Sequence, residues 1–433
     1  MRQLKTKMLL AATMLAVPAT LGAARPQPIE PVPVPAQIEQ GVSMIYVDPE
    51  LRPTDKAIEM LGMSRVETPE QQAAQPMDLF VPMNPMVTQL RRGLIKYHQQ
   101  WGRLPAVFIP AGPVMKKGST DPRVAQLRYR LGLAPGNGFD ATVDKKVRDF
   151  QRVHGLKVDG LVAGKTLNAL SLPPRDYELR LAANIERAKR LPDPERFPKY
   201  VMIDAGDSEL SMVDRGKTVG KMKVIVGTKE TPTPMMAAMI RYVNLNPYWN
   251  VPPDLVQTIM AKHVLEEGPG YLTYRHYEIM ADWSENAPLL DPAKVDWQAV
   301  ADRRLLVRMR RGPSPGNSMG DMKFMLPNDF GIYLHDYPEK AKFADSNLWI
   351  SNGCVRLSQA KQLAKFLFGY VPTPKTGKPE ERVDLPTPIP VYMTYFTAVP
   401  SATDGVTFRG DPYDRDQKVL ASYYNAQVPI GTF

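Results

Sequence analysis

The hydrophobic periodicity of this 433-residue chain changes at Lys199, and that change limits what the chain can fold into. Before Lys199, apolar side chains recur at helical spacing; after it they alternate with polar ones in short segments bounded by turn residues. The strands expected after the change are residues 200–204, 209–214, 220–226, 241–245, 322–325, 331–335 and 390–398. A helical first part followed by a β-rich second part favours a multidomain α+β protein.

The helical first part contains a small unit between residues 121 and 172. Asp121 and Pro122 open a first helix, the apolar spacing after Asp140 predicts a second, and residues 163–170 predict a third. Two further amphipathic helices are expected, over residues 85–101 and 177–191. Their order along the chain suggests that they pair as a scaffold around the three-helix unit.

Proline and the N-terminal residues mark the segments outside these folded parts. Residues 25–37 are proline-rich and predict an extended tether, and residues 371–390 predict a long surface loop. Residues 1–24 carry basic residues, then an apolar run, then small residues, which is the layout of a secretory signal peptide. An uncleaved anchor is the alternative. No later apolar stretch is long enough to suggest a membrane span, so we expect an exported protein.

Charge and metal-ligand spacing exclude several classes of partner. The formal charge is +10, and removing the three basic residues of segment 1–24 would leave +7. This balance suits an anionic surface, but the chain has no dense basic stripe with interleaved aromatic residues, so nucleic acid is not expected. The five histidines and one cysteine are too scattered to form a metal site, and we expect neither a metal nor another cofactor.

The only cysteine, Cys354, lies in the segment Ser-Asn-Gly-Cys-Val-Arg, nineteen residues after His335. An exported protein that keeps one unpaired cysteine has reason to keep it for reactivity. A neighbouring imidazole can take the thiol proton and create a nucleophile. Gly353 permits a tight bend that would turn the N–H groups of Gly353 and Cys354 towards an oxyanion. Arg356 alternates with its neighbours onto the Cys354 side, where it could pair with a substrate carboxylate.

Cys354 and His335 each also have a purely structural interpretation. Cys354 could be a small buried apolar residue, and His335 could simply end a strand. Neither reading explains why both residue types occur together at this spacing.

Residues 333–336 (Tyr-Leu-His-Asp) and 351–356 (Ser-x-Gly-Cys-Val-Arg) resemble the L,D-transpeptidase catalytic domain, also called YkuD-like. Asn352 departs from that pattern, because most members carry a second histidine there. The segments 246–252 and 312–317 resemble the YcbB-like branch, which shares this departure, carries a capping subdomain inserted in the catalytic domain and also has a peptidoglycan-binding module. In the first part, residues 147–167 resemble a three-helix peptidoglycan-binding-like module.

The resemblance implies a function and roles for individual residues. Cys354 would be the nucleophile and His335 the general base, with a backbone carbonyl rather than a side chain orienting the imidazole. The substrate-binding positions would be Arg356, Tyr333, Ser351, Asn352, Trp249 and Asn250. The reaction would be acyl transfer through a thioester, forming 3–3 cross-links between peptidoglycan stem peptides, with carbapenem-type β-lactams as covalent inhibitors. The location would be the periplasm of a Gram-negative bacterium, in contact with the cell wall.

The sequence patterns and the resemblance together predict a division of the chain into segments. These are a signal peptide (1–24), a proline-rich tether (25–44), an N-terminal part of the scaffold (45–118), the peptidoglycan-binding-like module (119–173), a scaffold helix (174–198), the catalytic domain (199–400) with a capping insert at about 253–304, and a C-terminal tail (401–433). Two alternative functions remain open at this point. One is an L,D-carboxypeptidase or another wall peptide hydrolase, and the other is a peptidoglycan-binding protein without catalysis.

Overall fold

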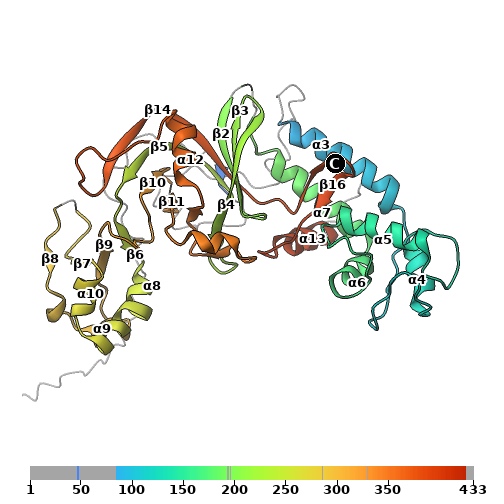
Figure 1. The fold of residues 1–433 in the computed structure, drawn as a ribbon, viewed down its shortest axis with the longest axis horizontal. Helices are drawn as coiled ribbons and strands as arrows, with labels where there is room; N and C mark the ends of the chain where they lie inside the picture. Colours follow the sequence, from blue (N-terminus) through green and yellow to red (C-terminus); the bar gives the residue numbers. More distant parts are fainter. Residues whose placement is uncertain are drawn as a thin grey trace, which may run out of the picture. The chain divides into compact units, whose positions relative to one another are not determined.

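The computed structural model describes residues 46–47, 84–192, 195, 197–284, 286–328 and 330–425 (Figure 1). The expected signal peptide and proline-rich tether, and most of the scaffold segment before residue 84, lie outside the described residues. Within the described ranges, no helix combines the length and the apolar character needed to cross a bilayer.

A ten-stranded mixed sheet, here called the main sheet, forms the β-rich part. Its strands are β1 (Tyr46–Val47), β2 (Lys199–Asp204), β3 (Glu209–Asp214), β4 (Lys217–Gly227), β5 (Met236–Leu245), β10 (Met322–Met325), β11 (Leu334–Asp336), β12 (Trp349–Ser351), β13 (Val355–Leu357) and β14 (Glu381–Thr394). The strand order is β1-β5-β10-β11-β13-β4-β3-β2-β14, and β14 also pairs with β5. Because β14 bridges β2 and β5, eight of the strands close into a ring without free edges.

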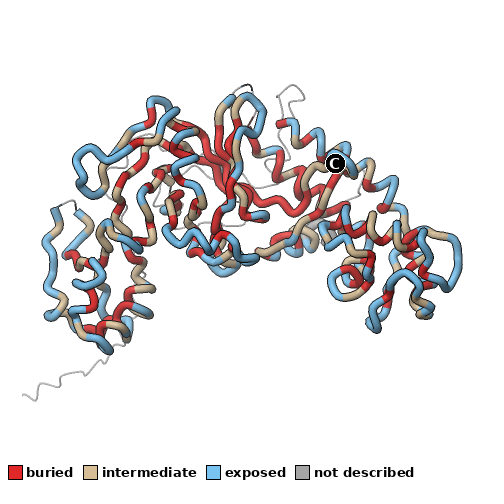
Figure 2. The backbone as a smooth tube through the Cα atoms, in the orientation of Figure 1, coloured by how far each residue is buried: buried red, intermediate tan, exposed pale blue. Residues whose placement is uncertain are grey.

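The closed ring encloses an apolar core. Alternate residues of each strand face this core, among them Val224, Phe324, Leu334 and Val355, all fully buried. Helix α12 (Ala360–Phe368) adds Leu363 and its neighbours to the same core. Buried backbone is accordingly concentrated along these strands in Figure 2. The side chains between the core-facing ones point to the opposite face of the sheet, where polar groups can lie together.

Two boundaries in the β-rich part differ from the sequence prediction. The strand expected at 331–335 is β11, which begins only at Leu334, because the Asn328 side chain hydrogen-bonds both the N–H and the C=O of Ile332 in place of a strand partner. Strand β14 begins inside the segment predicted as a loop. Pro386 and Pro388 are tolerated because the ladder with β5 is interrupted between Asp384 and Ile389.

The helix after the cysteine motif does not use its nearby serine as a cap. Serine favours helix N-caps, but α12 begins at Ala360 after Gln359 and not at Ser358. The Ser358 hydroxyl instead donates to the Lys223 carbonyl and ties the chain to β4.

The expected insert is a folded unit with its own core. Strands β6 (Trp249–Val251), β9 (Arg308–Arg311), β7 (Tyr277–Met280) and β8 (Leu289–Leu290) form a sheet in that order. Helices α8 (Pro253–Leu255), α9 (Ala261–Glu267), α10 (Gly270–Tyr274) and α11 (Trp297–Ala301) lie around this sheet (Figure 1). The unit is wider than residues 253–304, because the chain entering it pairs antiparallel with the chain leaving it, Trp249 opposite Arg311.

The helical part shares a second core. Helices α4 (Arg123–Arg130), α5 (Ala141–Val153) and α6 (Gly164–Ser171) form the three-helix unit, and α3 (Pro85–Tyr97) packs against α7 (Pro174–Ala188). His154, at the end of α5, lies in the middle of this core, stacked on Phe150 with ring centroids 3.7 Å apart.

The segment predicted as a C-terminal tail is part of the fold. Strands β15 (Ala398–Ser401) and β16 (Gly405–Phe408) form a hairpin, and β16 packs on α3 so closely that a Cβ atom at Gly93 would lie 2.2 Å from Val406 Cγ1. Helix α13 (Arg415–Asn425) packs on α7, and Asp416 at its start forms buried ion pairs with Arg180 and Arg187.

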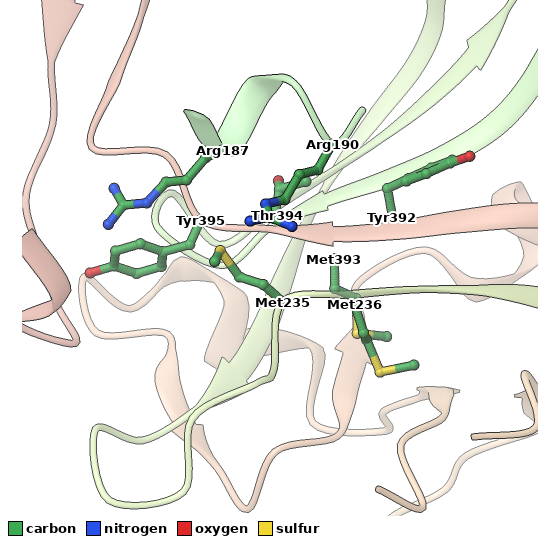
Figure 3. Close-up of a pocket in the computed structure, with 8 residues that line it drawn as sticks. All are labelled: Arg187, Arg190, Met235, Met236, Tyr392, Met393, Thr394 and Tyr395. Carbon is green, nitrogen blue, oxygen red and sulfur yellow. The ribbon is translucent and has the colours of Figure 1, made fainter. Parts of the chain in front are cut away.

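A small cavity lies where α7 meets β5 and β14 (Figure 3). Its lining includes Arg187 and Arg190 from the α7 end and Tyr395 after β14, with the Arg187 guanidinium 5.3 Å from the Tyr395 ring centroid. Its volume of about 20 Å³ has room for little more than a water molecule. This cavity is therefore a packing feature rather than a substrate site.

Burial of His154 predicts acid sensitivity of the fold. Burial lowers the pKa of His154 to about 3, whereas an unfolded histidine has a pKa near 6.5. Between those values the unfolded chain binds a proton that the folded chain does not, so stability falls as the pH drops from about 6.5. By pH 5 this group alone should remove about 2 kcal/mol of the free energy of unfolding.

Denaturant titrations at pH 7 and pH 5 measure this loss. His154→Phe should be less stable at pH 7, because Tyr97 Oη loses its partner, but its stability should change less between the two pH values. His263→Gln, at a half-exposed histidine of the insert, should keep the wild-type pH dependence. An unchanged pH dependence in His154→Phe would contradict the assignment.

Candidate active site

Four predicted site residues lie together, two on neighbouring strands and two directly before those strands. Strands β11 and β13 pair in parallel, with His335 opposite Arg356, and Val355 N–H donates to Tyr333 O at 3.2 Å just before the ladder. Leu334 and Val355 face the core, so Tyr333, His335, Cys354 and Arg356 alternate onto the other face. The rings of Tyr333 and His335 are 5.7 Å apart. The main sheet therefore brings thiol, phenol, imidazole and guanidinium to one surface.

The imidazole of His335 is held in one tautomer by the backbone. His335 is 2% exposed, and its Nδ1 lies 2.6 Å from the carbonyl oxygen of Asp336. A carbonyl oxygen only accepts, so Nδ1 carries the proton and Nε2 presents a lone pair. Burial, together with the positive charge of Arg356, lowers the pKa of His335 to about 3. The ring is therefore neutral at physiological pH and can accept a proton through Nε2.

The thiol of Cys354 is half-buried at the edge of the core. Burial raises its pKa above the ordinary value, although hydrogen bonds from the backbone and side chain of Tyr333 act in the opposite direction. Its Sγ lies 4.0 Å from the Gly331 carbonyl oxygen, and the described residues include no hydrogen bond between this thiol and His335. The resting pair is thus a neutral thiol near a neutral imidazole.

The turn before Cys354 is fixed by its own side chains. Ser351 is buried, and its hydroxyl accepts from Gly353 N–H at 3.2 Å and donates to Cys354 O at 2.7 Å. Gly353 has φ +107°, which side-chain-bearing residues rarely adopt. The Gly353 N–H that we assigned to the oxyanion is therefore occupied by Ser351. The N–H of Cys354 has no acceptor within the described residues.

A second loop, between β4 and β5, supports this turn from behind. Thr233 is buried, and its hydroxyl donates to Gly353 O at 2.7 Å and accepts from Gly227 N–H at 2.9 Å. Thr228 N–H donates to Ser351 O at 2.9 Å. Tyr413, in the segment predicted as a tail, donates to Gly227 O at 2.9 Å. Sequence reasoning missed Thr233, since no motif marks a lone threonine 120 residues from its partner.

The remaining predicted substrate positions differ in their surroundings. Asn352 is exposed at the tip of the turn, and the Arg356 guanidinium lies 4.6 Å from the Tyr337 ring centroid. Trp249 and Asn250 lie on β6, where Trp249 packs against the core of the insert near Tyr277. No hydrogen bond or ring contact joins these two residues to Cys354 or His335 in the described part of the chain. The structure therefore does not gather them with the other four.

The structure adds Lys323 and Glu380, which sequence reasoning also missed. Lys323 on β10 lies directly opposite His335, and its Nζ is 3.0 Å from Glu380 Oε1. Only Lys323 has a signal in the sequence, because it falls in the expected strand 322–325 on the face away from the core. Glu380 has no such signal. No group of three or more histidine, cysteine or acidic side chains arranged to hold a metal occurs among the described residues.

Comparison with known proteins supports the resemblance noted for the two parts of the chain. Residues 198–391 match the family YkuD, described as the L,D-transpeptidase catalytic domain. Residues 125–170 match the family described as "Putative peptidoglycan binding domain". A curated protein of Haemophilus influenzae, "Putative L,D-transpeptidase", is 30% identical over 227 residues. That match covers 51% of this chain and 44% of the relative, so the chain spans less than half of the relative's length.

Solved structures give a more distant likeness. An L,D-transpeptidase from Mycobacterium smegmatis is 12% identical, with 46% of this chain and 58% of that chain covered and a TM-score of 0.23. An L,D-transpeptidase from Xylanimonas cellulosilytica is 16% identical, with 66% and 98% covered and a TM-score of 0.18.

The β-rich part and the helical module thus define a multidomain protein of mixed α and β structure. Residues 198–391 match the L,D-transpeptidase catalytic domain of the YkuD family, and residues 125–170 match a peptidoglycan-binding-type module.

The contact between Thr233 and the cysteine turn predicts a positioning role. Thr233→Val keeps the shape of the side chain but removes the hydroxyl that holds Gly353 O and satisfies Gly227 N–H. Leaving these buried groups unpaired should cost about 1–3 kcal/mol and loosen the turn. The rate of covalent modification of Cys354 by a β-lactam should fall several-fold.

Thr233→Ser, which restores the hydroxyl, should recover both stability and rate. Stopped-flow acylation and thermal unfolding measure the two effects. If Thr233→Val lowers stability but acylates at the wild-type rate, Thr233 supports the fold without positioning the turn.

Proposed function

We propose that the protein is a cysteine-dependent L,D-transpeptidase that joins peptidoglycan stem peptides through a thioester intermediate. The observation that carries this proposal is the parallel pairing of β11 with β13, which places Cys354 and a neutral His335 on one face. The match of residues 198–391 to the catalytic domain family supports it independently.

In the first step, Cys354 becomes acylated by the donor stem. His335 Nε2 takes the thiol proton while Sγ attacks the carbonyl carbon of the amide between residues 3 and 4 of a donor stem. The resulting oxyanion is positioned to accept from Cys354 N–H. As the C–N bond breaks, the imidazolium returns its proton to the leaving nitrogen. The products are a thioester on Cys354 and a free D-alanine.

The pKa directions explain why proton transfer must accompany the attack. With the thiol pKa raised and the imidazole pKa near 3, a preformed thiolate–imidazolium pair is unfavourable in the free protein. Substrate binding therefore has to bring Nε2 and Sγ together, which fits the missing hydrogen bond between them. Proton transfer from the thiol then stays coupled to formation of the bond between Sγ and the carbonyl carbon. No exposed thiolate is left to react with other electrophiles.

In the second step, an amine from a neighbouring stem attacks the thioester carbonyl. His335 accepts the proton of that amine, the C–S bond breaks and the thiol is restored, leaving a 3–3 cross-link. Water in place of the amine would release a tripeptide. The insert, with its own core, is suited to act as a lid that excludes water, although the described contacts do not place it over Cys354.

We further propose that the protein works outside the cytoplasm, in the periplasm of a Gram-negative bacterium. The signal-like composition of residues 1–24 supports export, and the match of residues 125–170 supports contact with the wall. Carbapenem-type β-lactams are expected to acylate Cys354, because their strained carbonyl is open to a thiolate.

Removing the thiol tests the nucleophile. Cys354→Ala should abolish the cross-linked dimer formed from disaccharide-tetrapeptide and should abolish the single carbapenem adduct seen by mass spectrometry. The same spectra separate cross-linked dimer from hydrolysed tripeptide, and so measure transfer against hydrolysis. Thermal unfolding should be nearly unchanged. A carbapenem adduct that persists in Cys354→Ala would contradict the assignment of Cys354 as the nucleophile.

Removing the imidazole tests the base. His335→Ala should slow acylation roughly 10²–10⁴-fold, whereas His263→Ala, at a half-exposed histidine of the insert, should leave it unchanged. Because the thiol pKa is raised, alkylation of wild-type Cys354 by iodoacetamide should accelerate steadily from pH 6 to pH 9. A rate constant independent of pH over this range would show a preformed thiolate instead.

A further inference from the structure

The positive charge of the chain is concentrated in its helical part. Residues 84–192 contain 20 basic and 8 acidic residues, a formal charge of +12, whereas residues 193–433 contain 28 of each. Residues 1–83, with 7 basic and 9 acidic residues, bring the total to +10. The β-rich part is therefore electrically neutral, and the helical part alone attracts an anionic partner.

A short loop of the helical part exposes an uninterrupted apolar surface. Residues 108–114, between α3 and α4, read Phe-Ile-Pro-Ala-Gly-Pro-Val and are here called the apolar tip. Phe108 is 74% exposed and Val114 is 51% exposed, and of the residues in the tip only Ile109 is buried. The tip contains no polar side chain, and large apolar groups gathered in water in this way mark a contact surface.

The shape of the apolar tip is fixed by the rest of the helical part. Ile109 and Met115 lie in the core of that part, close to the two ends of the tip. The Arg123 guanidinium donates to the carbonyl oxygen of Pro110, at 3.0 Å, and to that of Pro113. Two carbonyl groups of the tip are thus already satisfied, and its two prolines have no N–H to donate. Such a surface suits hydrocarbon better than a hydroxyl-rich glycan, because a glycan has to be bound through hydrogen bonds.

Lysine side chains border the apolar tip. Met115 pairs with Val162 in an antiparallel bridge, and both side chains are buried. Their neighbours Lys116 and Leu161 therefore point outwards, where Leu161 is 38% exposed and extends the apolar surface. Lys117 follows directly and is also exposed. A basic pair beside an exposed apolar surface is typical of a segment that binds an anionic lipid interface.

We propose that the apolar tip and its two lysines dock the helical part on the surface of an anionic phospholipid bilayer. Phe108 and Val114 enter the boundary between headgroups and acyl chains, while the ammonium groups of Lys116 and Lys117 meet the lipid phosphates. The charge of residues 84–192 draws that part towards the membrane, whereas the neutral β-rich part has no such attraction. This docking is independent of the proposed function, because it uses none of the residues around Cys354.

The single cysteine of the chain allows a fluorescent label to report on the tip alone. In the full chain with Cys354→Ala, Val114→Cys is labelled with the environment-sensitive dye NBD. With vesicles that contain phosphatidylglycerol, the emission should shift to the blue and rise several-fold, whereas vesicles of phosphatidylcholine alone should change it little. Added salt should weaken the response, because it screens the lysines. The same label at Tyr274→Cys, an 82% exposed position of the insert, is the control and should not respond.

Two pairs of substitutions separate charge at the tip from charge elsewhere. In the labelled chain, Lys116→Glu with Lys117→Glu should weaken vesicle binding roughly tenfold or more, and Phe108→Ser should weaken it as well. Lys375→Glu with Lys378→Glu makes the same change of charge at exposed positions of the β-rich part and should leave binding unchanged. Thermal unfolding checks that each variant is folded. A response that depends on neither the lipid charge nor the lysine pair, or no response at all, would overturn the proposal.

Isolated peptidoglycan tests the other anionic partner that this face could meet. The label at Val114→Cys should not respond to it, because the apolar side chains find no hydrocarbon there. A label that responds to peptidoglycan and not to anionic vesicles would make the tip a wall contact and would refute the docking on a bilayer.

Discussion

The site depends on the parallel pairing of β11 with β13. Each strand has only three residues, yet each is held by a neighbour on its other side, β10 and β4, within a sheet that closes on itself. Closure removes the free edges at which short strands would slip. A shift of one residue would turn His335 towards the core and Leu334 away from it. The register that buries Leu334 and Val355 is therefore also the register that assembles the reactive face.

Burial sets the chemistry of that face. The same low-polarity surroundings lower the pKa of His335 and raise that of Cys354, so both groups rest uncharged. Lys323 and Arg356 supply positive charge on either side, and this charge lowers the pKa of Cys354 against the effect of burial. The Asp336 carbonyl fixes which nitrogen accepts the proton, and it does so without adding a negative charge beside the thiol. In the proposed mechanism, reactivity is therefore reserved for a bound substrate.

Support for the cysteine turn comes from distant parts of the chain. Thr233 holds Gly353, Tyr413 holds Gly227 beside it, and Asp416 ties the same C-terminal segment to α7. The helical part and the main sheet therefore share a continuous set of buried polar contacts. A chain ending at residue 400 would lose Tyr413 and Asp416, and with them this support.

The sequence by itself determined the local features. The change of period at Lys199, the helices of the three-helix unit and the pairing of residue types at Cys354 and His335 all follow from short-range patterns, because periodicity and motif spacing are local. Only the tertiary structure decided which residues meet across strands. Lys323, Glu380 and Thr233 carry no motif and join the site through register and closure. Trp249 packs against the core of the insert, because burying part of its indole there is favourable. The local sequence around β6 does not reveal this contact. The C-terminal segment folds because α3 and α7 offer it apolar surface, which no local pattern reveals.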